Sequence, residues 1–140
     1  MHALSDPVFE QGRRGTMGLL RHIRDGGMRV LLFDVYDSAG VTLDFMGQPA
    51  PTLTSAAEIA VKTGALFVPF FGIRQADGLS FEVVFEAPVP HGPPVEMMAE
   101  VTRRLEARIA AHPGQWFWIH RRWKPKRQRK RAARAAAERG

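Results

Sequence analysis

The sequence predicts an α/β fold, with a small mixed β-sheet of three or four strands and helices packed on it. Two short apolar runs, at residues 30–33 and 65–71, lack alternation and are typical of strands covered on both faces. Residues 55–63 lie between them with a helical pattern, so the order is that of a βαβ unit. Because ligands of such units bind beyond the carboxyl ends of the strands, we expect a site after each run.

The chain has 140 residues, which favours one domain with its own core. Residues 121–140 contain ten of the 20 Lys and Arg but one of the 14 Asp and Glu, leaving ten basic and 13 acidic residues before them. We therefore predict a mildly acidic domain over residues 1–124 and a basic tail over residues 125–140. The sequence has no cysteine, which excludes disulfides and thiolate chemistry. It shows neither a signal peptide nor an apolar run of the ~20 residues that a spanning helix needs, so we expect any membrane association to be peripheral or to come from residues that this chain lacks.

Capping and breaking residues delimit the predicted helices. Thr16 can cap a first helix that continues to Arg24, and the glycines at positions 26–27 end it. Ser55 and Glu58 have the spacing of a capping box, in which each side chain accepts from the other's free backbone N–H. Gly64 should end that second helix.

The second half of the chain predicts a hairpin and a longer helix. Residues 75–78 have turn chemistry, and residues 80–85 alternate, as a half-buried strand does. After a proline-rich connector, residues 95–111 have helical spacing. The positions expected to face inward are Met98, Val101, Leu105 and Ile109, and those expected to face outward are Arg103, Arg104 and Glu106.

Asp34 and Asp37 are the first candidate site residues, because they occupy the loop that follows the first apolar run. Two acids there could position a substrate hydroxyl or a basic group. The alternative is turn chemistry, since Asp caps turns and helices readily. Both interpretations remain open on the residues alone.

No metal site and no catalytic motif is predicted. None of the five histidines has convincing ligand spacing with another histidine or an acid. His91 and Glu96 are five positions apart, but a Gly-Pro-Pro sequence between them breaks the helical geometry that such a pair would need. No nucleophile elbow, phosphate-binding loop or dinucleotide fingerprint is present.

Residues 116–124 begin with aromatic residues and end with basic residues around one further tryptophan. Such a mixture suits contact with lipid headgroups, but the tryptophans could equally fill the core. We expect at least one tryptophan to be core and the cations to stay outside it. The basic tail could bind anionic lipid, bind nucleic acid or have no partner. Lipid is favoured modestly, and nucleic acid disfavoured because no zinc finger or RNP motif accompanies the tail.

Four segments of the sequence have the character of family motifs: ALFVPFFGIR at residues 65–74, LFDVYDSAG at 32–40, FMGQPAPT at 45–52 and HPGQWFWIHRRWK at 112–124. Together they resemble the bacterial lipid A biosynthesis lauroyl/myristoyl acyltransferases, of the lysophospholipid acyltransferase superfamily. The resemblance covers about residues 13–124, and the last motif is the most specific. Phe33 and Tyr36 depart from the family's usual proline and glutamine.

The resemblance implies that this chain corresponds to the C-terminal half of such an enzyme. The upstream half of the family carries a membrane helix and a catalytic His-x4-Asp motif, and nothing in this sequence corresponds to that motif, so no catalytic residue is assigned and the chain should be inactive alone. The implied substrate-binding residues are Asp34, Asp37, Gly40, Pro69 and Arg74, and the implied headgroup contacts are Trp118, Arg121, Arg122, Trp123 and Lys124.

The resemblance also implies the reaction and the partners. The complete enzyme would move a fatty acyl chain from an acyl-carrier-protein or coenzyme A thioester to a lipid A precursor or lysophospholipid, with no cofactor. The chain would lie on the cytoplasmic face of the inner membrane, in contact with anionic lipid. A separate upstream catalytic half is a further partner that the resemblance allows. The alternative is a non-catalytic module that binds membrane or nucleic acid through the basic tail.

Overall fold

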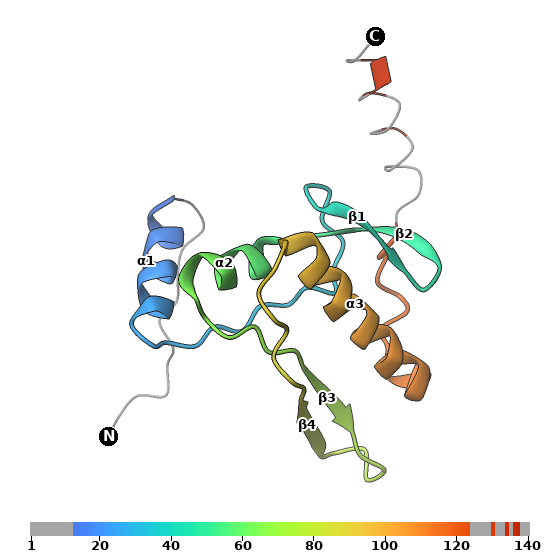
Figure 1. The fold of residues 1–140 in the computed structure, drawn as a ribbon. Coiled ribbons are helices and arrows are strands. Elements are labelled where there is room, and N and C mark those ends of the chain that lie inside the picture. The colour runs from blue at the N-terminus through green and yellow to red at the C-terminus, as the bar shows by residue number, and fades with distance from the viewer. Residues whose placement is uncertain (1–12, 124–129, 131–133, 135, 138–140) are drawn as a thin grey trace, which may run out of the picture.

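The computed structural model describes residues 13–123, 130, 134 and 136–137, and it confirms the α/β class. The elements are α1 (Arg13–Arg24), β1 (Val41–Phe45), β2 (Gln48–Thr52), α2 (Ser55–Thr63), β3 (Phe70–Arg74), β4 (Phe81–Phe85), α3 (Pro94–Ala111) and the 3₁₀ helix η1 (Pro113–Gln115). In Figure 1 the three α-helices lie side by side, and the β3–β4 hairpin extends away from them. The predicted division at residue 124 stays a prediction, because most of the basic tail lies outside the described residues.

The four strands of the described residues form two separate antiparallel hairpins, β1–β2 and β3–β4. The predicted parallel βαβ unit within one mixed sheet is therefore wrong. Residues 30–33 form no strand. Phe33 is half-buried and packs against the core, whereas Leu32 is 79% exposed. Within the part of the chain that the structure describes, no strand pairs with this run, so its apolar character does not produce a strand.

The helices match the predictions closely. α1 begins at Arg13, three residues before the predicted start, and Gly26 follows it with a φ of 88°. α2 has the predicted bounds and ends at Gly64, whose φ of 73° is left-handed. The capping box of Ser55 and Glu58 is wrong, because Thr54 occupies the N-cap position and its hydroxyl donates to Glu58 at 2.5 Å.

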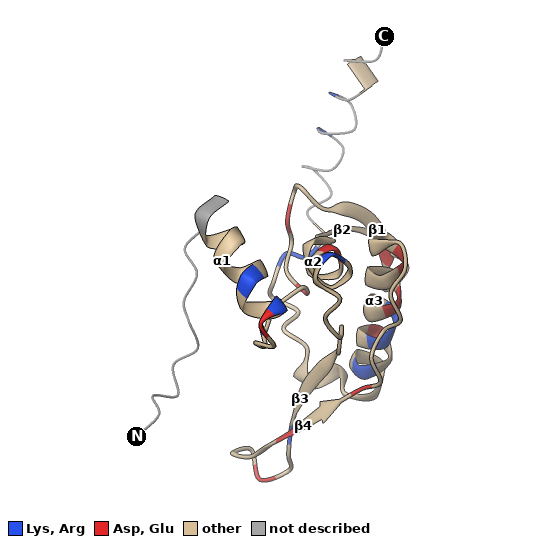
Figure 2. Ribbon diagram, turned by 60° about the vertical axis from the view of Figure 1, so that its left-hand side comes forward, with Lys and Arg blue, Asp and Glu red and all other residues tan. Residues whose placement is uncertain are grey.

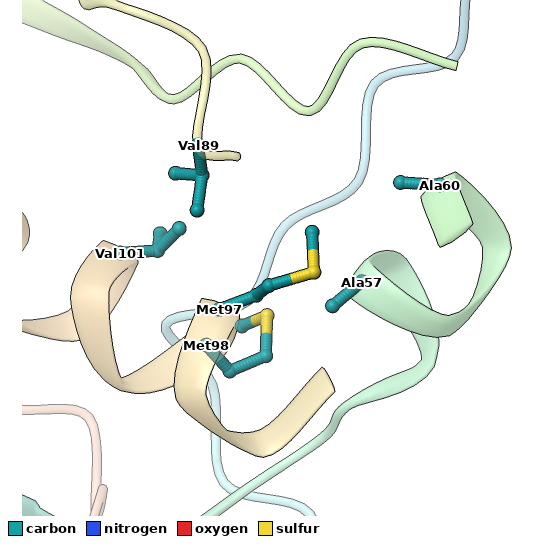
Figure 3. Close-up of a cluster of buried hydrophobic side chains, with 6 residues drawn as sticks. All are labelled: Ala57, Ala60, Val89, Met97, Met98 and Val101. Carbon is teal, nitrogen blue, oxygen red and sulfur yellow. The ribbon is translucent and has the colours of Figure 1, made fainter. Parts of the chain in front are cut away.

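The core lies between α2 and α3, and Met97 and Met98 stand at its centre (Figure 3). A second cluster joins α3 to the β1–β2 hairpin through Phe45 and Ala50, both buried. All four α3 residues that were expected to face inward are buried, as the helical period predicts: Met98, Val101, Leu105 and Ile109. α3 thus connects the helical layer to the hairpin that carries the candidate site.

The β3–β4 hairpin has an apolar outer face. Phe70 is paired with Phe85 and Gly72 with Val83, so these four residues lie on one face with Phe81. Phe85 is 67% exposed, and its ring stacks on that of Phe70 with centroids 5.5 Å apart. The predicted alternation is therefore present, but the apolar side is turned to solvent. Figure 2 shows few charged positions along these strands, in contrast to the alternating charges on α3.

Candidate functional site

The acidic loop of residues 34–40 leads directly into β1 and is tied at both ends. At its start, the backbone N–H of Tyr36 donates to Nε2 of His120 at 3.1 Å. At its end, Gly40 is buried against the backbone of β2, and a Cβ atom built there would lie 2.5 Å from the carbonyl carbon of Thr52. Only glycine allows such a close approach, so the residue type at position 40 sets how the loop meets the hairpin.

Asp37 caps the turn inside this loop. Its Oδ1 accepts the N–H of Ala39 at 2.8 Å, and its backbone carbonyl accepts the N–H of Gly40 at 3.2 Å. This is the Asx-type turn chemistry that was the alternative to a functional role. Asp37 therefore stabilises the turn of the loop. Asp34 differs, because its charge acts on a buried arginine.

Asp34 acts electrostatically on a buried guanidinium, that of Arg122. Arg122 is only 3% exposed, donates to the Thr52 hydroxyl at 2.6 Å and to the carbonyl of Pro51, and lies over the ring of Phe45 at 5.6 Å. Burial lowers the pKa of Arg122 below its ordinary value, and the negative charge of Asp34 opposes that shift. The negative charge of the half-buried Asp34 thus offsets part of the cost of burying this cation.

Arg122 corrects the expectation that the cations of residues 116–124 stay outside the core. A contact with lipid headgroups would require the guanidinium at the surface, which it does not reach. Its neighbour Trp123 is also turned inward. The Trp123 ring stacks on Phe45 with centroids 5.4 Å apart, and its Nε1 donates to the Phe45 carbonyl at 3.2 Å. Trp116 packs against the same ring at 5.8 Å, which confirms that a tryptophan of this segment belongs to the core.

Other residues of the segment are exposed. Trp118 is 51% exposed and donates from Nε1 to the carbonyl of Pro113 at 2.8 Å. Arg121 is exposed as well, and so are Phe117 and Ile119. Lys124 lies outside the described residues. A surface of mixed aromatic, aliphatic and cationic character thus remains beside the buried Arg122 and Trp123.

Pro69 and Arg74 are part of the β3–β4 hairpin and not of the acidic loop. Pro69 is buried, and its carbonyl accepts the N–H of Glu86 at 3.0 Å. Arg74 lies over the Phe81 ring at 5.3 Å and lines a cavity of about 350 Å³. The remaining lining residues are Gly72, Phe81, Gly114 and Gln115. The structure therefore divides the predicted substrate-binding residues between the loop and the hairpin.

The described residues contain no group of three or more His, Asp or Glu side chains that could hold a metal ion. No helix among them is long and apolar enough to cross a bilayer. His91, the histidine of the dismissed pair with Glu96, donates from Nε2 to the Ala65 carbonyl at 2.9 Å. The acidic loop can bind and orient a polar group through one carboxylate and through the backbone groups of its turn.

Sequence reasoning missed three residues at this junction. Thr52 and His120 belong to motifs that had been recognised, so a signal for them existed in the pattern of residue types. Tyr36 takes part through its backbone N–H, which leaves no signal in the sequence. Both hydrogen bonds, Tyr36 to His120 and Arg122 to Thr52, join segments that are 84 and 70 positions apart in the chain.

Comparisons with known proteins show the family to which the chain belongs. The model of the family described as bacterial lipid A biosynthesis acyltransferase matches residues 10–125, which include the acidic loop and the segment of His120 and Arg122. One curated relative is the lipid A biosynthesis lauroyltransferase of Escherichia coli (strain K12), 31% identical over 84 residues. The match covers 57% of this chain and 27% of the relative, so the matched part of the chain spans about a quarter of that protein's length. Because the family model matches most of the chain, the protein belongs to the bacterial lipid A biosynthesis acyltransferases.

Proposed function

We propose that this chain supplies the acceptor-binding part of an enzyme that transfers a fatty acyl chain to a lipid A precursor. The donor is a thioester on acyl carrier protein or coenzyme A, and no further cofactor takes part. The observation that carries the proposal is the acidic loop, held between β2 and His120 by residues that all lie inside the family match. A lysophospholipid is the other acceptor that the superfamily resemblance suggests.

The reaction requires a base that this chain does not provide in the family's usual form. The acceptor hydroxyl oxygen attacks the thioester carbonyl carbon, the C–S bond breaks, and the carrier leaves as a thiol with the proton that the hydroxyl loses. In the family motif that proton is taken by a histidine oriented by an aspartate five positions later. The sequence contains no His-x4-Asp. The proposed role of this chain is therefore binding and orientation of the acceptor.

Asp34 is the acid proposed to contact the acceptor. Of the two loop acids, Asp37 already accepts the Ala39 N–H within the turn, whereas Asp34 lies where the loop meets the buried cation. A carboxylate in that place accepts hydrogen bonds from sugar hydroxyls, the polar groups that a glycolipid acceptor presents.

Exposed apolar surface supports a second, catalytic part that packs against this chain. The outer face of β3–β4 and the run at residues 30–32 together expose Leu32, Phe81 and Phe85 to an unusual degree for a monomer. The match covers 27% of the lauroyltransferase, so most of that longer protein lies outside the match and is enough additional chain to cover these surfaces. We propose that the catalytic part lies there, whether in the same polypeptide or a separate one.

Peripheral contact with the cytoplasmic face of the inner membrane completes the proposal. Phe117, Trp118 and Ile119 are exposed beside Arg121, and the sequence that follows contains most of the basic tail. Exposed aromatics with cations favour the headgroup region of an anionic bilayer. Such a position would bring the chain to the level at which a lipid acceptor presents its polar groups.

Acceptor kinetics test the role of Asp34. The assay combines this chain with a polypeptide carrying the family's His-x4-Asp part and measures acyl transfer to a lipid A precursor. Asp34→Asn should raise the acceptor KM by about tenfold, the loss of roughly one charged hydrogen bond, and leave the donor KM unchanged. Asp25→Asn, at an exposed acid after α1, is the matched control. Unchanged acceptor kinetics in Asp34→Asn would remove this residue from the site.

A further inference from the structure

The segment of residues 120–123 lies between the acidic loop and the β1–β2 hairpin and contacts both. His120 accepts from the loop at Tyr36, Arg122 donates to β2 at Thr52, and Trp123 packs on Phe45 of β1. These contacts come from successive residues of one short stretch. The relative position of loop and hairpin therefore depends on this stretch, which is more than 60 residues away in the chain.

His120 contacts the loop in a defined chemical form. A backbone N–H can only donate, so Nε2 of His120 must carry its lone pair, and the ring proton belongs on Nδ1. The bond fixes the backbone of Tyr36, two positions after Asp34. The hydrogen bond therefore fixes the path of the loop backbone directly after Asp34.

Arg122 is connected to the hairpin by a chain of polar contacts. Its guanidinium donates to the Thr52 hydroxyl at 2.6 Å, and that hydroxyl donates in turn to the Ala50 carbonyl at 3.2 Å. A guanidinium fits two acceptors in a fixed geometry, and here the second is the Pro51 carbonyl. Thr52 is also the residue on which Gly40, the end of the loop, rests.

Burial of the Arg122 guanidinium costs desolvation free energy, so a charged residue at this position indicates interactions that an apolar residue could not make. An apolar residue of similar length could pack on Phe45 without the desolvation cost of a charge, and buried ion pairs are often replaceable in that way without loss of stability. An apolar residue would neither orient Thr52 nor act on the charge of Asp34. The interactions specific to the guanidinium are therefore those with β2 and with the acid of the loop.

We propose that His120 and Arg122 are positioning residues that hold the acidic loop in the shape that binds the acceptor. This inference rests on the proposed function for its last step, acceptor binding, but not for the holding of the loop. Arg122 is too deeply buried to touch a ligand, so it acts through Asp34 and Thr52. The segment thus works as a clamp, and its removal should loosen the loop before it unfolds the domain.

The loop itself gives the first readout, by NMR of the full chain. Arg122→Met keeps the length of the side chain but loses charge and donors, Arg122→Lys keeps the charge but not the two-acceptor geometry, and Arg121→Met at the exposed neighbour is the control. We expect Arg122→Met to shift the amide resonances of residues 34–40 and to speed exchange of the Gly40 amide about tenfold, as loss of one charged hydrogen bond predicts. Arg122→Lys should be intermediate and the control unchanged.

A second pair of variants covers the case in which Arg122→Met fails to fold. His120→Gln can still accept the Tyr36 N–H through its amide oxygen, whereas His120→Phe keeps a ring without an acceptor. Only His120→Phe should speed exchange of the Tyr36 amide, by about tenfold. The proposal would be overturned by two results together. The loop amides would be unchanged in His120→Phe, and in Arg122→Met the amides would be unchanged or altered throughout the domain.

The second readout is the acceptor KM in the acyl-transfer assay with the catalytic part supplied. A positioning role predicts that His120→Phe raises the acceptor KM about tenfold while kcat and the donor KM change less than about twofold, and that His120→Gln restores the acceptor KM. A merely structural role predicts loss of active protein at constant acceptor KM, which would contradict the inference. If wild-type protein shows no transfer while the loop amides respond as expected, the proposed function fails and the holding of the loop by the clamp stands.

Discussion

The side-chain amide of Gln115 forms hydrogen bonds with both backbone polar groups of Arg74: Oε1 accepts its N–H at 2.8 Å, and Nε2 donates to its carbonyl at 3.0 Å. One side chain thus replaces a neighbouring strand at the end of β3. The contact ties the protruding hairpin to η1, which follows α3. It also defines the cavity beside Arg74, because Gln115 forms part of its wall.

Removal of this contact should free the end of the hairpin. Gln115→Leu loses both hydrogen bonds at an exposed site, so we expect a loss of about 1 kcal/mol in the free energy of unfolding and faster exchange of the Arg74 amide. Urea unfolding and hydrogen exchange measure the two effects. Gln48→Leu, at an exposed position on β2, is the control; equal effects in both variants would mean that the contact does not hold the hairpin.

The close approach of Gly40 to β2 predicts a strong dependence on residue size. Gly40→Ala places a Cβ atom 2.5 Å from the Thr52 carbonyl carbon, which the backbone can relieve only by moving. We expect a loss of about 1–3 kcal/mol in the free energy of unfolding, as for overpacked sites. Gly72→Ala is the control, since a Cβ there meets nothing within 4 Å. Calorimetry showing similar melting temperatures for both variants would disprove the close packing of loop on hairpin.

The charges on the outer face of α3 predict a weak pH dependence at acid pH. Hydrogen bonds from Arg103 and then Arg104 lower the pKa of Glu100 from 4.5 to about 2. Because the folded pKa lies below the unfolded one, the stabilisation is complete above pH 4.5 and is lost as the pH falls to 2. These ion pairs are exposed to solvent, so we expect the effect on the free energy of unfolding to be small. The difference in unfolding free energy between wild type and Glu100→Gln should shrink over that interval; a constant difference would show that these ion pairs do not stabilise the fold.

Membrane contact should depend on the exposed residues next to the clamp. Phe117→Ser combined with Ile119→Ser removes two exposed apolar side chains, each of which would contribute about 1.5–3 kcal/mol if buried in a bilayer. Co-sedimentation with anionic vesicles should therefore fall at least about tenfold, whereas Val61→Ser on α2 should have no effect.

Salt separates the apolar part of this contact from the electrostatic part. Attraction between the basic tail and an anionic surface is screened within about 8 Å at physiological ionic strength, but apolar insertion is not. Binding to anionic vesicles should fall with salt to a residual level set by the aromatic residues. Binding to duplex DNA or RNA with no binding to vesicles would favour the nucleic-acid alternative and contradict membrane contact.

The helices could be predicted from the sequence because their signals are local. The four inward residues of α3 recur at helical spacing, and Gly64 supplies the left-handed residue that ends α2. The β1–β2 hairpin gave no such signal. Its turn places Met46 at a φ of 55°, a conformation for which Asn or Gly is the usual sign, and β2 contains two prolines, which normally argue against a strand.

The site was predicted in part, for a similar reason. The acidic loop and the residues around His120 could be recognised as motifs, but their contact joins positions far apart in the chain. The inward orientation of Arg122 could not be predicted, because arginine is rarely buried and its acceptors are a hydroxyl and a carbonyl contributed by another element. The run at residues 30–33 was wrongly predicted as a buried strand, because its apolar residues would need a covering layer that the described residues do not provide.

Acyl transfer measured with and without the catalytic part tests the central claim most directly. The substrates are a fatty acyl thioester on acyl carrier protein and a lipid A precursor, and the product is the acylated precursor. The account predicts no transfer by this chain alone, because a general base contributes about 10²–10⁴-fold, and clear transfer once a polypeptide with the His-x4-Asp part is added. Transfer by the chain alone that is abolished in His91→Ala, or no transfer by the combined parts, would contradict it.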